Sequence, residues 1–110
     1  MDIASEAARL REAAEAKPLK LPVRRRVDDT HRALTPDGLT IWFTIQVSAH
    51  ARIYDAVFER GDRMPGDEEC QAWLGELMGG RDPQEAPALP GSRTRHFEAF
   101  ERDAVHAPIA

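Results

Sequence analysis

The strictest alternation of apolar and polar side chains lies at residues 39–47, and it predicts a β-strand. The apolar side chains of this stretch are Leu39, Ile41, Phe43, Ile45 and Val47. Because the side chains of a strand point alternately to its two faces, this set belongs to one face of a sheet. The stretch is also rich in β-branched and aromatic residues, which favour strands. A chain that contains this segment must bury that face under other apolar residues.

The segment before this strand also predicts extended structure. Residues 19–34 alternate more weakly, and Pro22 indicates an edge position or a strand start, because proline has no N–H to donate to a ladder. The sequence TPDG at residues 35–38 predicts a turn, with its glycine in the left-handed position.

A hairpin partner for the central strand is predicted at residues 51–60, after a short connection at residues 48–50. Its alternation is less regular, because Asp55 shares one face with Ile53 and Val57. A β-bulge would account for this irregularity. Residues 19–60 are therefore interpreted as a β-meander.

This register places three aromatic side chains on the face opposite the core. They are Trp42, Tyr54 and Phe58. Large apolar side chains on an open face mark a contact site, so these three are the predicted interaction residues. Either the N-terminal helix or another chain, such as a second copy in a homodimer, would cover them.

Two helices are predicted, one before the meander and one after it. Residues 1–17 are rich in alanine, and Asp2 is suited to cap the start. The narrow apolar face of this helix consists of Ile3, Ala7, Leu10 and Ala14. Residues 66–79 carry an apolar stripe at helical spacing behind an acidic first turn. The stripe consists of Cys70, Trp73, Leu74, Leu77 and Met78.

The C-terminal third contains a Pro-rich loop at residues 81–92 and an ambiguous segment at residues 93–100. We interpret the segment as a strand, although Phe97 and Phe100 also fit a helical stripe, and we expect a flexible tail at residues 103–110. A chain of 110 residues fits one domain. The predicted fold is an α+β single small domain, with a mostly antiparallel three- to four-stranded sheet, two helices and the order α-β-β-β-α-β.

Basic residues form a second candidate surface, for nucleic acid. Lys20, Arg24 and Arg26 share one side of the first extended segment, and Arg93 and Arg95 would add to them. The alternative is a solvated strand face paired with acids on its neighbours. We favour the solvated face, because the chain carries a net charge of −4 and Asp28 and Asp29 follow the arginines directly.

No catalytic motif or complete set of metal ligands is recognisable, so no cofactor and no metal are expected. The histidines are scattered at His31, His50, His96 and His106. Asp28, Asp29 and His31 are close in sequence, but no second cluster completes a site. An enzyme would need a pocket where separated residues such as His31, His96 and Glu69 converge.

These observations predict a non-enzymatic protein-interaction domain that binds a protein partner or itself. Cys70 is the one cysteine, so no intrachain disulfide forms and a reducing compartment is expected. Its place on the apolar stripe predicts a buried, inert thiol. No apolar run approaches the ~20 residues that span a bilayer. We therefore expect a soluble cytoplasmic protein without membrane contact.

Overall fold

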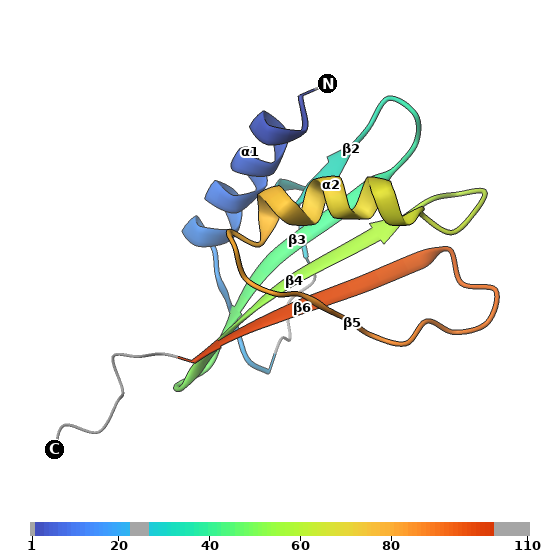
Figure 1. Cartoon of the computed structure of the whole chain (residues 1–110). Helices are drawn as coiled ribbons and strands as arrows, with labels where there is room; N and C mark the ends of the chain where they lie inside the picture. The colour runs from blue at the N-terminus through green and yellow to red at the C-terminus, as the bar shows by residue number, and fades with distance from the viewer. Residues whose placement is uncertain (1, 23–26, 103–110) are drawn as a thin grey trace, which may run out of the picture.

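The computed structural model describes residues 2–22 and 27–102, which form two helices and a six-stranded mixed sheet (Figure 1). The elements are α1 (Ile3–Ala16), β1 (Leu19–Lys20), the 3₁₀ turn η1 (Asp29–His31), β2 (Arg32–Leu34), β3 (Thr40–Val47), β4 (Ala51–Glu59), α2 (Asp67–Leu77), β5 (Gln84–Glu85) and β6 (Thr94–Arg102). The α+β class with two helices is confirmed. Neither helix in these two stretches is long and apolar enough to cross a membrane.

The sheet has more strands than predicted because short segments pair with its long central strands. β3, β4 and β6 form an antiparallel core, and β5 pairs with β6 inside the predicted Pro-rich loop. The predicted extended segment 19–34 is divided into β1, which runs parallel to the end of β3, and β2, which is antiparallel to its beginning. β1 ends before Pro22, which has no N–H for a ladder, and Asp28 caps η1 by accepting from the Thr30 N–H at 2.9 Å.

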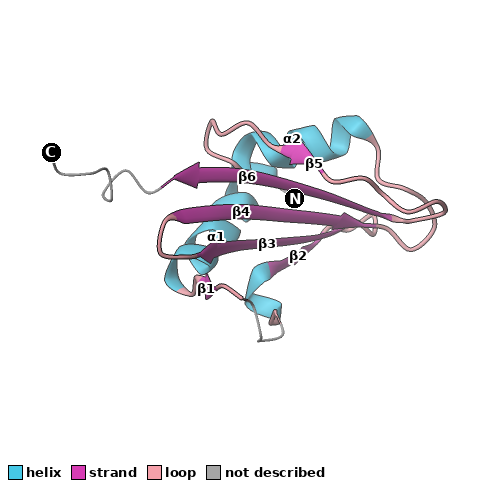
Figure 2. Cartoon of the chain, turned by 90° about the horizontal axis from the view of Figure 1, so that it is seen from below, coloured by secondary structure: helices cyan, strands magenta, loops and turns pink. Residues whose placement is uncertain are grey.

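Both helices lie on the same face of the sheet (Figures 1 and 2). α1 begins where predicted, with the Asp2 carboxylate accepting a hydrogen bond from the Ala4 N–H. Its predicted apolar face is confirmed, because Ala7, Leu10 and Ala14 are fully buried. α1 therefore does not cover the opposite face, which was one of the two predicted alternatives.

The register of the β3–β4 hairpin differs from the predicted one by one residue. Val47 pairs with Arg52, and the Ser48 N–H donates to the Ala51 carbonyl at 2.9 Å, so only residues 49 and 50 form the loop. A one-residue shift turns every side chain of a strand to the other face. Phe43 consequently faces Ala56, and no bulge interrupts the β3–β4 pairing.

α2 closes the core over this sheet. All five residues of its predicted stripe are buried, and Gly66 is its N-cap. β6 confirms the strand interpretation of residues 93–100, with Phe97 and Ala99 buried beneath the helices. The tail at 103–110 lies outside the described residues.

Cys70 is expected to react with thiol reagents only when the chain opens. The thiol is fully buried, and burial raises its pKa to about 11, so little reactive thiolate exists near neutral pH. We expect labelling of the native protein to be slower than labelling of the unfolded chain by on the order of 10³-fold or more. Stopped-flow labelling with and without denaturant measures this ratio. Similar rates in both states would contradict the burial of this side chain.

Candidate functional site

The candidate site is the face of β3, β4 and β6 that is turned away from both helices, which we call the open face (Figure 2). Its central side chains are Trp42, Thr44 and Gln46 of β3, Ile53, Asp55 and Val57 of β4, and His96, Glu98 and Phe100 of β6. Cross-strand pairing arranges them in three rows. An apolar pair lies in each outer row, and polar side chains fill the middle row.

The two apolar pairs lie at opposite corners of the open face. Trp42 is opposite Val57 in one row, and Ile53 is opposite Phe100 in the other. Phe100 is 67% exposed, whereas the other three side chains are half-buried. The Arg32 guanidinium lies 5.5 Å from the centre of the Trp42 ring and covers part of it.

Asp55 in the middle row is the centre of a polar network that also includes His96 and Gln46 from the outer rows. Asp55 is opposite both Thr44 and Glu98, and its Oδ2 lies 2.8 Å from His96 Nε2. The Gln46 amide also donates to this oxygen at 3.3 Å. The Asp55 side chain is only 13% exposed, so its carboxylate is held largely out of water. Such a carboxylate needs a positive or donating partner, and His96 provides it.

A hollow of about 200 Å³ opens beside this network. Its lining residues are Val27, Trp42, Thr44, Gln46, Asp55 and Val57. The lining therefore combines three apolar side chains with hydroxyl, amide and carboxylate groups. This combination is typical of a small binding site.

The prediction that Trp42, Tyr54 and Phe58 form one exposed surface is wrong. Tyr54 is 3% exposed and Phe58 is fully buried, and both pack in the same core as Phe43. The cause is the shorter hairpin loop, which turns the even-numbered residues of β4 to the helices. Only Trp42 lies on the open face, where Ile53, Val57 and Phe100 take the place of the other two.

The predicted basic surface is only partly within the described residues. Arg24 and Arg26 lie outside them. Lys20 pairs with Val47 at one end of β3. Arg93 precedes β6 and Arg95 is its second residue, so both lie at the other end of the sheet, where Thr40, Glu59 and Thr94 are paired. These ends are roughly 20 Å apart at the rise of a strand. Arg95 also binds Glu85 at 2.8 Å and Asp67 at 2.7 Å, so its charge is already paired.

The residues considered for metal binding, Asp28, Asp29 and His31, have separate partners and do not form one site. Asp28 binds Thr30 and His31 within η1, while Asp29 lies 3.4 Å from Arg32. The hydrogen bonds from Thr30 lower the pKa of Asp28 to about 2. His31 is buried beneath α1, and its Nε2 has no hydrogen-bond partner within the described part of the chain.

Glu69 belongs to a different cluster on the helix side of the sheet. It binds the buried Arg60 together with Asp37. A hollow of about 230 Å³ borders these two acids, but Arg60 already satisfies them. His96 is on the opposite side, so a shared pocket for His31, His96 and Glu69 is excluded.

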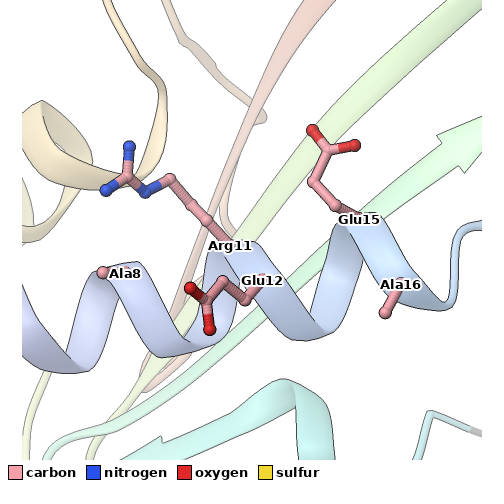
Figure 3. Close-up of a pocket in the computed structure, with 5 residues that line it drawn as sticks. All are labelled: Ala8, Arg11, Glu12, Glu15 and Ala16. Atoms are coloured by element: carbon pink, nitrogen blue, oxygen red, sulfur yellow. The ribbon is translucent and has the colours of Figure 1, made fainter.

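A third hollow, of about 580 Å³, lies on the outer side of α1 (Figure 3). All its lining residues come from this one helix, and Arg11, Glu12 and Glu15 extend away from one another. No chemical group converges there, so the open face remains the best candidate among the described residues.

Comparisons with protein-family models, with curated proteins and with solved structures found no significant match to this chain. Inference about function therefore depends on the open face and its side chains.

Proposed function

We propose that this protein is a small non-enzymatic interaction domain whose open face binds a second copy of the same chain. The observation that supports the proposal is the pair of apolar corners that neither helix covers: both helices pack on the other face, and Phe100 remains 67% exposed. Apolar groups on an open sheet face gain free energy when another chain removes them from water. The buried Cys70, which has no disulfide, supports a reducing compartment such as the cytoplasm.

The arrangement of the apolar corners is self-complementary. Val57 and Ile53 lie on β4 at equal distances to either side of Asp55. A two-fold axis that crosses the strands at Asp55 would place Val57 of one copy against Ile53 of the other. The same axis would place the Phe100 ring against His96, and each contact would occur twice. The carboxylates near the axis oppose this pairing, and within each copy Asp55 is in contact with His96 at 2.8 Å.

The molecular mass in solution tests this proposal. Light scattering during size-exclusion chromatography is expected to give about twice the 12.3 kDa chain mass at high micromolar concentration. We expect Phe100→Ser and Ile53→Ser to shift the protein toward monomer, because each places a hydroxyl where the partner chain offers an apolar surface. Leu89→Ser is the matched control, since Leu89 is 80% exposed but lies in the loop between β5 and β6.

Two results would contradict the proposal. One is a wild-type protein that stays monomeric at every concentration. The other is a dimer that persists in Phe100→Ser and dissociates in Leu89→Ser, which would place the interface on the β5–β6 loop.

Nucleic-acid binding gains no support from the described residues, because their basic side chains are separated along the sheet or paired with acids.

A further inference from the structure

We propose that Asp55, His96 and Glu98 form a binding site for a divalent metal ion of the zinc type. The three residues come from two adjacent central strands, and β4–β6 pairing places Asp55 directly opposite Glu98. His96 Nε2 lies 2.8 Å from Asp55 Oδ2 and 4.0 Å from Glu98 Oε1. All three potential ligand atoms are within 4.8 Å of one another.

The charge arrangement favours a bound cation. Like charges directly opposite each other on neighbouring strands destabilise a sheet, and Asp55 is mostly buried as well. Within the described residues, the ion pairs of both carboxylates involve only His96. A single imidazole can offset at most one of the two negative charges. A divalent cation between the three ligand atoms would offset both carboxylates.

The ligand set also suits such an ion chemically. One imidazole nitrogen and two carboxylate oxygens are common ligands of zinc and of related transition metals. Three protein ligands leave a coordination position free for water or a small ligand. Asp55 also borders the hollow of about 200 Å³, which lies on the β3 side of this residue. The Gln46 amide that donates to Asp55 would orient this carboxylate from the second shell of the metal.

The rigidity of the backbone supports binding without rearrangement. β4 pairs continuously with β3 on one side and β6 on the other, so the Cα positions of all three ligands are held by ladder hydrogen bonds. Sites on strands are more accurately positioned than sites on loops. To share one ion, His96 and Asp55 exchange their 2.8 Å hydrogen bond for bonds to the metal. The proposal does not depend on the dimer, because all three ligands belong to one chain.

Titration with Zn²⁺ alone tests the site, with isothermal calorimetry as the measurement. We expect one Zn²⁺ per chain, and affinity lower by about 100-fold or more in His96→Gln and in Asp55→Asn, because the first removes the imidazole nitrogen and the second removes the negative charge of the carboxylate; even loss of an outer-shell partner costs about 10–100-fold. His50→Gln is the control and should bind as the wild type does, because His50 lies in the β3–β4 loop. Visible absorption of bound Co²⁺ provides a second readout that reports on ligand geometry.

Glu98→Gln separates a metal site from a merely structural network. Without metal, this variant should be at least as stable as the wild type, because it removes the repulsion with Asp55, yet it should bind Zn²⁺ more weakly. Phe100→Ser should still bind Zn²⁺ even if it is monomeric, which distinguishes this proposal from the proposed dimer. The absence of saturable Zn²⁺ binding to the wild type, or binding that is unchanged in His96→Gln, would overturn the proposal.

Discussion

Phe58→Ala is expected to lower the free energy of unfolding by about 4 kcal/mol, whereas Val57→Ala should lower it by about 1 kcal/mol. The two residues are neighbours on β4 but face opposite sides of the sheet. Phe58 is fully buried, and its ring packs edge-on against Phe97 at 5.8 Å between centroids. Removing it creates a cavity in the core, while truncating the half-buried Val57 mainly changes the open face.

Urea denaturation followed by circular dichroism measures both changes. Should Phe58→Ala prove too unstable to fold, Phe58→Leu provides a milder substitution of the same ring, with an expected loss of about 1–2 kcal/mol. A larger loss for Val57→Ala than for Phe58→Ala would contradict the register of the hairpin. In that case Ile53 and Val57 would belong to the core, and the composition of the open face would have to be revised.

Local periodicity explains which parts of the fold could be predicted. The helical stripe at Cys70–Met78 and the alternation at Leu39–Val47 are each complete within one segment. The burial of the stripe, and of every apolar residue of the alternation except the half-buried Val47, therefore follows from the sequence. The short strands β1 and β2 lie in a segment that alternates only weakly, and β5 lies in the predicted Pro-rich loop. Pairing with β3 and β6 determines where these strands begin and end. Single-segment patterns do not contain that information.

The candidate site was not predicted from the sequence, because the site depends on the length of the β3–β4 loop and on the pairing of β4 with β6. Asp55 disturbed the predicted core face of β4, and a charged residue there is equally a signal that the register is shifted. The two-residue period of a strand at residues 93–100 puts His96, Glu98 and Phe100 on one side, as the structure does. The pairing of β6 with β4, which joins residues some 40 positions apart, could not be read from either strand alone.

Arg60→Met is expected to lower the free energy of unfolding by about 3 kcal/mol near neutral pH. The Arg60 side chain is 6% exposed, and it binds Glu69 at 2.5 Å and Asp37 at 2.8 Å. It also donates to the Asp37 carbonyl at 3.0 Å, and it thereby joins the end of β4, the β2–β3 turn and the start of α2. Methionine retains much of the apolar stem but leaves these acceptors without their donor.

Arg63→Met is the matched control for this substitution. Arg63 lies 3.4 Å from the same Glu69 carboxylate, but its side chain is 56% exposed. An exposed ion pair contributes little, so we expect a change below about 0.5 kcal/mol. Equal losses in the two variants would contradict the special role of the buried guanidinium. Chemical denaturation of both proteins under identical conditions gives the comparison.

The pH dependence of the Arg60→Met effect separates charge from packing. The hydrogen bonds from Arg60 hold the pKa of Glu69 below its usual value of 4.5 in the folded protein. A carboxyl group with a lowered folded-state pKa stabilises the fold fully above its unfolded pKa, and this contribution is lost as the pH falls through the folded value. The stability difference between wild type and Arg60→Met should therefore narrow below pH 4.5. A difference that stays constant on acidification would mean that Arg60 acts through packing rather than through its charge.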